Sequence, residues 1–194
     1  MTRKVSLQKI ILLLGGARSG KSRFAQEYAR RNGENVLFVA TATAGDEDMR
    51  RRIEKHKKDR PANWRTLEVV TNIGIQIEAN ARDAQLIVID CITMLVNNIF
   101  SRYDNKLFNA IDDSVLEKEV VAEIEQLQMC MKKVRASFLI VSNEVGLGLV
   151  PDNRMGRLYR DFLGRANQML AQESDEVYLL VAGIPLQVKP SNTL

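Results

Sequence analysis

Residues that build disulfide frameworks and zinc sites are scarce in this sequence. Its 194 residues include two cysteines, Cys91 and Cys130, and one histidine, His56. Two isolated cysteines are too few for a disulfide framework or a zinc site. We therefore expect a protein with reduced thiols that works in the cytoplasm.

Long apolar runs, low-complexity tracts and linkers rich in proline, glycine or serine are also absent from the sequence. The longest apolar run near the N-terminus, residues 10–14, is far shorter than the ~20 residues that span a bilayer, so we expect no membrane span. Hydrophobic residues make up 45% and charged residues 27%, which excludes global disorder. The length suits one domain over residues 1–194. The net charge of +4 fits an anionic small ligand and a nucleic acid equally well.

Five short runs of valine, isoleucine and leucine end abruptly in small or polar residues. Such continuous apolar runs are typical of strands buried on both faces of a parallel sheet. They occupy residues 9–14, 36–40, 86–89, 138–141 and 177–182. Helical patterns fill the gaps, at residues 22–31, 46–58, from 114 onward and at 154–171. This alternation predicts an α/β fold with a doubly wound or P-loop-type sheet.

Local signals predict where some of these elements begin and end. Ser114 and Glu117 have the spacing of a capping box, which places the start of a helix at Ser114. A single buried stripe then follows at four-three spacing, formed by Val120, Ile124, Leu127, Met131 and Val134. Residues 101–113 are polar and weakly patterned, which predicts a loop or insertion. Pro185 and Pro190 mark a short extension after the last strand.

The segment between the first strand and the first helix fits the phosphate-binding pattern G-x-x-x-x-G-K-[ST] without a mismatch. Its residues are Gly15, Gly16, Ala17, Arg18, Ser19, Gly20, Lys21 and Ser22. Glycines let the backbone curl so that N–H groups face phosphate oxygens, and the new helix adds its positive end. Lys21 is suited to reach the β- and γ-phosphates, and the Ser22 hydroxyl to ligate Mg²⁺. The alternative, a glycine-rich turn that matches by chance, is disfavoured by the strand–loop–helix context. The pattern predicts a bound nucleoside triphosphate but not the reaction.

Polar residues follow the other predicted strands, and ligands of open parallel sheets bind beyond these carboxyl ends. Asp90 follows the run at residues 86–89 as a Walker B acid would, suited to hold Mg²⁺ or to accept a proton from a substrate hydroxyl. The alternative for Asp90 is a helix N-cap. Glu144 suits a metal or substrate contact and a capping role equally. Asn143 does not begin the Asn-Lys-x-Asp sequence that reads guanine, which disfavours a regulatory GTPase.

The only histidine, His56, lies in a strongly basic segment, residues 49–61. A solvated helix face and a patch for nucleic acid or anions are the simplest interpretations of that segment. Met49, Ile53 and His56 share one helical face, so placement alone favours a histidine in the core. The surrounding cations suit phosphate, however, and Asp59 lies one turn on, where it can orient the ring. A neutral imidazole attacks phosphorus and leaves readily, so a nucleotidyl-histidine intermediate is the competing hypothesis.

Taken in order, these segments resemble one enzyme family. The loop at residues 15–22 is followed by Arg23, by Ala40-Thr41-Ala42, by His56-Lys57-Lys58-Asp59-Arg60-Pro61 and by Trp64-Arg65-Thr66. Further matches are Asp90-Cys91-Ile92-Thr93, Ser142-Asn143-Glu144-Val145-Gly146 with Val150-Pro151, Arg160-Asp161 with Gly164, and Asn167-Gln168. Over residues 11 to about 189 the sequence resembles the bifunctional adenosylcobinamide kinase/adenosylcobinamide-phosphate guanylyltransferase family of cobalamin biosynthesis.

The resemblance implies two activities. The kinase phosphorylates the hydroxyl of the aminopropanol arm of adenosylcobinamide with ATP or GTP. The guanylyltransferase then moves GMP from GTP onto that phosphate, forming adenosylcobinamide-GDP and pyrophosphate through a GMP-histidine, for which His56 is the matching position. Besides the loop, the positions implied to contact the guanine nucleotide are Ala40, Thr41, Ala42, Lys57, Lys58, Asp59, Arg60, Glu68 and Asp90. The resemblance also implies Mg²⁺, a three-layer fold similar to RecA-type P-loop proteins, and a homotrimer.

Two other functions remain open at this point. A plain small-molecule kinase would use the same loop and keep His56 in its core. A nucleic-acid-stimulated P-loop ATPase would use the basic segment, residues 50–58, to contact a phosphate backbone. The mild net charge and the lack of a basic-aromatic motif disfavour this second function, so we expect no nucleic-acid partner. Some relatives carry a second histidine where this chain has Lys55, so no other imidazole can replace His56 here.

Overall fold

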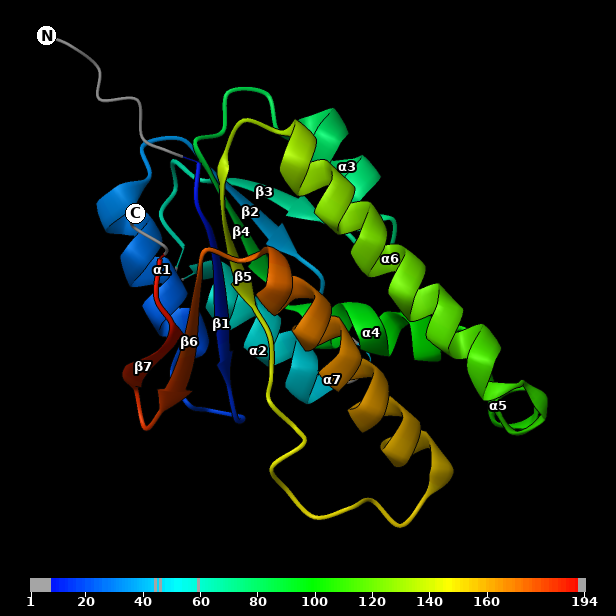
Figure 1. The fold of residues 1–194 in the computed structure, drawn as a ribbon. Helices are drawn as coiled ribbons and strands as arrows, with labels where there is room; N and C mark the ends of the chain where they lie inside the picture. The colour runs from blue at the N-terminus through cyan, green and yellow to red at the C-terminus, as the bar shows by residue number, and fades with distance from the viewer. Residues whose placement is uncertain (1–7, 44, 46, 59, 192–194) are drawn as a thin grey trace, which may run out of the picture.

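A mostly parallel sheet lies at the centre of the protein in the computed structural model, which describes residues 8–43, 45, 47–58 and 60–191 (Figure 1). Within these residues the sheet has seven strands in the order β3-β2-β4-β5-β1-β6-β7, and only β7 runs antiparallel to its neighbour. The strands are β1 (Ile10–Gly15), β2 (Val36–Ala40), β3 (Arg65–Glu68), β4 (Leu86–Asp90), β5 (Ser137–Val141), β6 (Glu176–Val181) and β7 (Ile184–Lys189).

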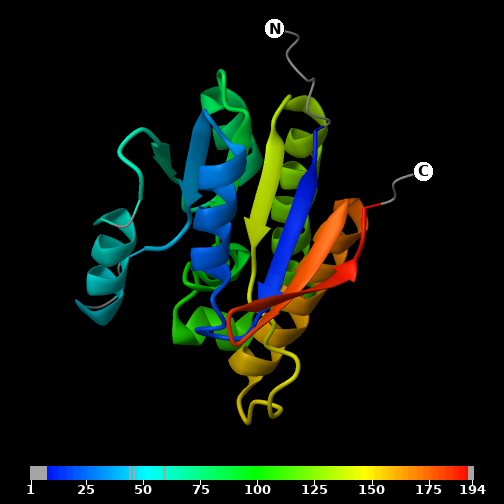
Figure 2. The same cartoon turned by 90° about the vertical axis from the view of Figure 1, so that its left-hand side faces the viewer.

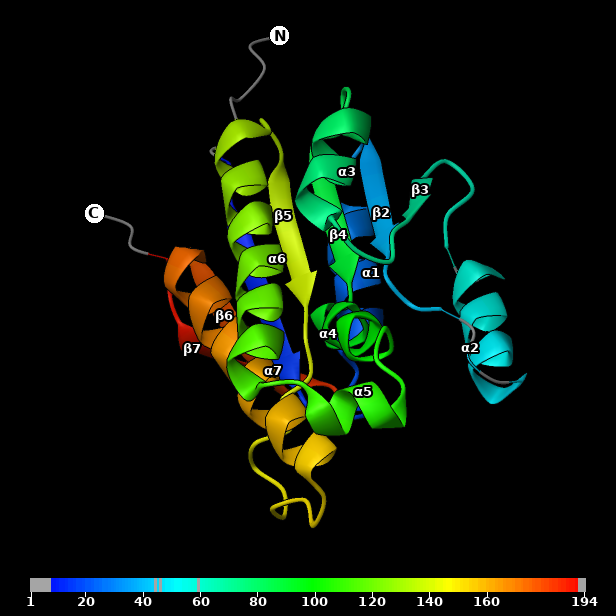
Figure 3. The same cartoon turned by 90° about the vertical axis from the view of Figure 1, so that its right-hand side faces the viewer.

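Helices cover both faces of this sheet. They are α1 (Lys21–Asn32), α2 (Glu47–Lys58), α3 (Ile73–Asn80), α4 (Ile92–Phe100), α5 (Asn105–Ala110), α6 (Asp113–Lys133) and α7 (Arg154–Glu173). Helix α1 covers one face (Figure 2), and α3, α4, α6 and α7 cover the other (Figure 3). The predicted three-layer α/β architecture is confirmed. Among the described helices, none is long and apolar enough to cross a bilayer.

The apolar runs are continuous because the central strands are buried on both faces. Along β1, Leu12 belongs to the larger core cluster under α3, α4, α6 and α7, whereas Ile11 and Leu13 belong to the cluster under α1. The same alternation occurs in β5, where Phe138 packs on one side and Leu139 on the other. Burial on both faces removes the polar positions of an amphipathic strand, as expected for a parallel sheet.

The register of the sheet brings the ends of neighbouring strands together. Ala40 of β2 lies opposite Asp90 of β4, and Asp90 lies opposite Val141 of β5. Val141 in turn lies opposite Leu13, close to the end of β1. Residues that follow these strands therefore share one edge of the sheet, at the bottom of Figure 1.

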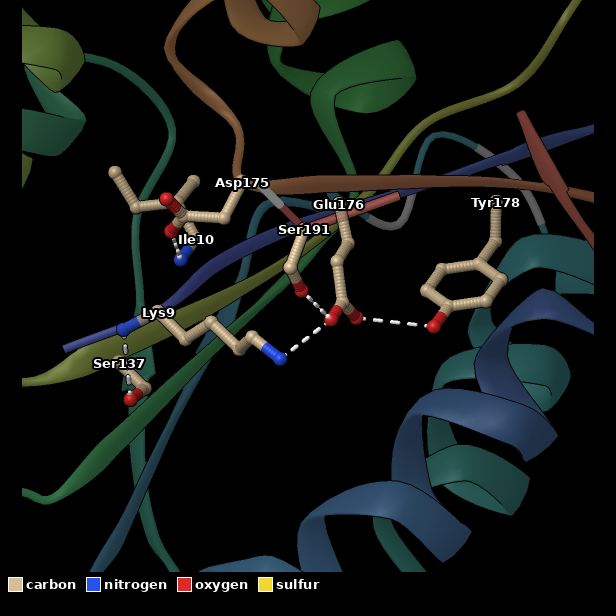
Figure 4. Close-up of polar contacts among 7 residues, drawn as sticks. All are labelled: Lys9, Ile10, Ser137, Asp175, Glu176, Tyr178 and Ser191. Atoms are coloured by element: carbon tan, nitrogen blue, oxygen red, sulfur yellow. Dashed lines mark hydrogen bonds and ion pairs between the residues drawn. The ribbon is translucent and has the colours of Figure 1, made fainter. Parts of the chain in front are cut away.

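A polar cluster ties the opposite end of the sheet together (Figure 4). Glu176, at the start of β6, is paired with Lys9 and accepts hydrogen bonds from Ser191 and from Tyr178, the latter at 2.9 Å. Burial disfavours the charged form of Glu176, but these hydrogen bonds outweigh it and lower the pKa of the carboxyl. The cluster fixes the segment that follows β7 against β6 and against the residue that precedes β1.

Three predicted boundaries differ from the structure. Helix α6 begins at Asp113, and its N-cap is Asp112, whose side chain accepts from the backbone N–H of Ser114, so the capping box at Ser114 is wrong. Residues 101–113, predicted as a loop, contain α5 with Asp104 as its N-cap. The extension with Pro185 is the strand β7, where proline is tolerated because β7 is an edge strand of the sheet.

A carboxylate from α6 caps the start of α3. The backbone N–H groups of Asn72 and Ile73 donate to the two carboxylate oxygens of Glu123, at 3.0 and 2.7 Å. Glu123 is buried, and the first N–H groups of a helix have no partner within the helix itself. The contact therefore joins two helices of the same layer.

Replacing Glu123 by alanine should lower the free energy of unfolding by about 2 kcal/mol, because two buried N–H groups lose a charged acceptor. Urea unfolding followed by circular dichroism measures this loss. Glu125→Ala, at an exposed position of the same helix, is the matched control and should stay within about 0.5 kcal/mol of the wild type. Equal losses in the two variants would contradict the capping role.

Candidate functional site

The loop between β1 and α1 has backbone conformations that require glycine. Gly15 and Gly20 have φ angles of 150° and 96°. A Cβ atom on Gly15 would lie 2.5 Å from the carbonyl oxygen of Leu180 in β6. Gly20 immediately precedes α1 in a left-handed conformation, so the loop turns sharply into the first N–H groups of the helix. These groups and the helix dipole make the turn an anion-binding site.

The turn between β6 and β7 supports this loop from the side. Ala182 and Gly183 have φ angles of 51° and 84°, as a tight hairpin turn requires. The N–H of Gly183 donates to the carbonyl oxygen of Ser19 at 2.9 Å. A Cβ atom on Gly20 would lie 3.0 Å from the Cα atom of Gly183, so the turn and the loop are in close backbone contact.

Lys21 is held inside the loop. Its Nζ donates to the carbonyl oxygens of Gly15 and Gly16 at 2.8 and 2.7 Å. The side chain is buried, and burial lowers the pKa of the ammonium, whereas Cys91 and Asp90 act in the opposite direction. The ammonium therefore lies inside the loop, where it is bonded to two loop carbonyl oxygens.

Asp90 is the carboxylate on which the predicted site residues converge. It ends β4 and receives a side-chain hydrogen bond from Ser22. Burial raises the pKa of Asp90, and the hydrogen bond from Ser22 and the charges of His56, Arg60 and Lys21 oppose this rise. The N-cap of α4 is Cys91 rather than Asp90, so the N-cap interpretation of Asp90 is wrong. The structure thus places a lysine, a hydroxyl and a carboxylate near one another, and the Arg60 guanidinium also acts on Asp90.

The segment at Ala40, Thr41 and Ala42 joins strand ends. The Thr41 hydroxyl donates to the carbonyl oxygen of Cys91 at 2.7 Å and accepts from its N–H at 2.8 Å. Asn98 of α4 donates to the carbonyl oxygen of Thr41 at 2.8 Å. The Thr41 side chain is buried in these contacts, so it fixes the position of the Asp90-Cys91 segment. Sequence analysis did not identify Asn98, because an asparagine inside an apolar helix gives no motif.

His56 lies on α2, which stands apart from the sheet beyond β3 (Figure 3). Its side chain is exposed, so the interpretation of His56 as a core histidine is wrong. Ile53, on the same helical face, is half-buried. Lys57 and Lys58 are also exposed, whereas Asp59 lies outside the described residues.

A pocket of about 330 Å³ lies between the end of α2 and β3. Its lining residues are Lys57, Arg60, Pro61, Ala62, Trp64, Thr66 and Glu68. Lys57 pairs with Glu68 across it, and the Arg60 guanidinium lies 3.8 Å from the centre of the Phe38 ring. The Arg60 Nε is buried without a hydrogen-bond partner among the described residues. Three of the predicted nucleotide contacts, Lys57, Arg60 and Glu68, therefore line one pocket.

Glu144 and Asn143 have structural contacts at the end of β5. The Glu144 carboxylate accepts from the N–H of Gly146, which supports its capping role. The N–H of Glu144 donates to the carbonyl oxygen of Gly15 at 3.0 Å, and Asn167 of α7 donates to the carbonyl oxygen of Asn143, also at 3.0 Å. These contacts attach the start of the β5–α7 loop and helix α7 to the phosphate-binding loop.

A glycine-rich loop between β1 and α1, with the half-buried Asp90 at the end of β4, defines a P-loop nucleotide-binding protein. Residues 11–188 match the family model described as cobinamide kinase / cobinamide phosphate guanyltransferase. The chain belongs to this family and is an enzyme, as the kinase and guanyltransferase activities in that description state.

The chain matches two relatives over almost their whole length. The chain is 38% identical over 181 residues to the bifunctional adenosylcobalamin biosynthesis protein CobU of Escherichia coli (strain K12), covering 93% of this chain and 99% of the relative. It is 39% identical to the CobU protein of Salmonella typhimurium (strain LT2), with the same coverage.

A likeness to one solved structure concerns the fold alone. That protein is an ATPase from the type III secretion system of pathogenic bacteria, with a TM-score of 0.51 and 9% identity. The match covers 88% of this chain and 50% of the ATPase chain. It supports the predicted P-loop fold.

Replacing Gly183 by alanine should weaken nucleotide binding about tenfold. A left-handed backbone disfavours a Cβ by about 1–2 kcal/mol, so the strained turn moves and its hydrogen bond to the carbonyl oxygen of Ser19 is weakened. Titration with a fluorescent nucleotide measures the Kd. Ala182→Gly, in the same turn, is the matched control and should bind as the wild type does. An unchanged Kd in Gly183→Ala would show that the turn does not position the loop.

Neither cysteine should react as a nucleophile in the folded protein. Burial and the charge of Asp90 raise the pKa of Cys91 to about 12, and burial with the charge of Glu78 does the same for Cys130. At pH 8 the thiolate fraction is then on the order of one in ten thousand. A disulfide reagent should therefore find no fast thiol in the native protein and two in urea. A fast native thiol lost in Cys91→Ser would contradict the buried, protonated state.

Proposed function

We propose that this enzyme carries out two successive reactions, the first at the sheet edge that holds Lys21 and Asp90 and the second at His56 of α2. It phosphorylates the aminopropanol hydroxyl of adenosylcobinamide with ATP or GTP, and then transfers GMP from GTP onto that phosphate. The products are adenosylcobinamide-GDP and pyrophosphate. The phosphate-binding loop with Lys21 held inside it, together with Asp90 at the end of β4, is the observation that carries the proposal.

In the kinase step the loop N–H groups and Lys21 bind the triphosphate. The substrate hydroxyl attacks the γ-phosphorus, the bond to the β-phosphate oxygen breaks, and the nucleoside diphosphate leaves. Asp90, at the end of β4, is the carboxylate placed to accept the proton of the hydroxyl.

The donor set at the loop fits a magnesium ion. The Ser22 hydroxyl and the Asp90 carboxylate are hydrogen-bonded neighbours, and both offer the hard oxygen ligands that Mg²⁺ prefers beside substrate phosphates. Bound there, Mg²⁺ would neutralise phosphate charge during the transfer. Ser22 and Asp90 are the residues that would hold it.

In the guanylyl step the imidazole of His56 attacks the α-phosphorus of GTP. The bond to the β-phosphate oxygen breaks, and the pyrophosphate that leaves takes up the N–H proton that the imidazole loses. The phosphate of adenosylcobinamide phosphate then attacks the same phosphorus, the P–N bond breaks, and the imidazole takes up a proton from water and is restored. The exposed position of His56 and the pocket beside it, with Arg60, Lys57 and Glu68, support this assignment. The cations near His56 stabilise the charge that develops at phosphorus.

The remaining proposals concern the whole chain. Residues 1–194 act as one catalytic domain, and the enzyme works in the cytoplasm as a homotrimer. The edge strand β7 exposes apolar side chains, including Ile184, Leu186 and Val188, and such an edge is normally covered. Its apolar character supports an oligomer.

Incubation with Mg²⁺ and GTP labelled at the α-phosphate tests the guanylyl step. The wild type should retain label through denaturation, and the label should be labile to acid, stable to base and absent from His56→Ala. Arg51→Ala, an exposed cation on the same helix, should be labelled as the wild type is. Labelled protein should pass its label to adenosylcobinamide phosphate.

Phosphorylation of adenosylcobinamide separates the two steps. His56→Ala should keep this activity within about twofold, whereas Lys21→Ala should lose at least about a hundredfold, because charge stabilisation at the phosphates carries most of the catalysis. A wild type that binds GTP but takes no label would leave a kinase without guanylyl transfer.

A further inference from the structure

The β5–α7 loop exposes an unusual group of apolar side chains. Leu147 and Leu149 are 84% and 96% exposed, and Val150 is 66% exposed. Adjacent apolar side chains in water commonly mark a binding surface. The loop starts at Glu144, which is bonded to Gly15 of the phosphate-binding loop, and it lies at the same edge of the sheet (Figure 1).

A hollow of about 450 Å³ adjoins this loop on the outer face of α7. Its lining residues are Gly146, Arg160, Asp161, Gly164, Arg165 and Gln168. Arg160 pairs with Asp161, with 3.3 Å between Nε and Oδ1, and Arg165 pairs with Glu117. The charges around the hollow are therefore balanced, and it offers both donors and acceptors. Such a lining suits neutral amides better than a second phosphate.

No contact among the described residues explains why position 164 is a glycine. It lies in the interior of α7, and a Cβ atom placed on it would meet no atom within 4 Å. Glycine is less favourable than alanine in a helix, so a glycine at position 164 lowers the stability of α7. The absence of a side chain keeps the floor of the hollow open to a molecule from outside.

We propose that the hollow on α7 and the apolar residues Leu147 and Leu149 form the docking surface for the corrinoid substrate. The inference rests on the proposed function. A corrinoid has a broad apolar face and a rim of amide side chains. Leu147 and Leu149 would contact the apolar face, while Arg160, Asp161 and Gln168 would bond the rim amides. Helices α2 and α7 lie at opposite sides of the sheet (Figure 3). The pocket at the end of α2 and the hollow on α7 are lined by different residues, so nucleotide and corrinoid would approach from different sides.

Gly164→Met and the double variant Leu147→Ser/Leu149→Ser test this surface. Methionine is a good helix former, so Gly164→Met fills the hollow without weakening α7. Equilibrium dialysis with adenosylcobinamide, followed by its visible absorbance, should show at least about tenfold weaker binding in each variant. In the kinase assay the KM for adenosylcobinamide should rise by a similar factor, with kcat, the KM for ATP and the GTP labelling of His56 unchanged. Met129→Ser, at an exposed apolar position on α6, is the control and should change none of these quantities.

Light scattering measures the mass of the assembly and so tests the alternative occupant of this surface, a second copy of this chain. Variants with wild-type mass and weaker corrinoid binding support the docking surface. Unchanged corrinoid binding in the variants overturns the proposal, because the surface then has no role in docking. A lower mass together with loss of His56 labelling overturns it in favour of a subunit contact. Because dialysis needs no catalysis, a wild type that binds adenosylcobinamide without phosphorylating it refutes the kinase proposal alone.

Discussion

The close backbone contact between the phosphate-binding loop and the end of β6 is the constraint on which the site depends. Gly15 lies against the carbonyl of Leu180, and Gly183 donates to the carbonyl of Ser19. Side chains at Gly15 or Gly20 would push these backbones apart, and the loop N–H groups would no longer converge. The loop shape also fixes Lys21, whose ammonium is bonded to loop carbonyls. The C-terminal hairpin therefore belongs to the nucleotide site, although its residues are far from the loop in sequence.

The half-buried carboxylate of Asp90 organises the charge at this edge. Burial alone would favour the neutral form of Asp90, and Ser22, His56, Arg60 and Lys21 act against it. Such an environment keeps the proton affinity of the carboxyl sensitive to what is bound nearby. Phosphate oxygens would draw the cations toward themselves and leave Asp90 a stronger base. The same group of residues can therefore suit transfer of a γ-phosphoryl group and attack at an α-phosphorus.

The central part of the fold was predictable because it follows from burial. Strands β2 and β4 coincide with apolar runs, and the loop at residues 15–22 lies where its pattern predicts. The edge strands β3 and β7 were missed because strands exposed to solvent do not need continuous apolar runs. Strand β3 alternates between half-buried and exposed residues, and β7 is largely exposed. The cap of α6 was misassigned because Asp112 and Ser114 both suit an N-cap, and only the backbone conformation decides between them. For His56 the spacing from Met49 and Ile53 predicted burial, but the side chain is exposed, because a sequence does not show whether a helical face has a partner.

The arrangement of the two hollows gives a physical reason for a covalent histidine. Adenosylcobinamide phosphate and GTP are both polyanions, and their direct reaction would bring them together at one phosphorus. A guanylyl group stored on His56, with pyrophosphate already gone, removes most of that repulsion before the second anion arrives. The pocket proposed to take the nucleotide adjoins α2, whereas the hollow on α7 adjoins the β5–α7 loop, which is bonded to the phosphate-binding loop. An acceptor docked on α7 would keep its place through both steps, and only the nucleotide would need to be exchanged.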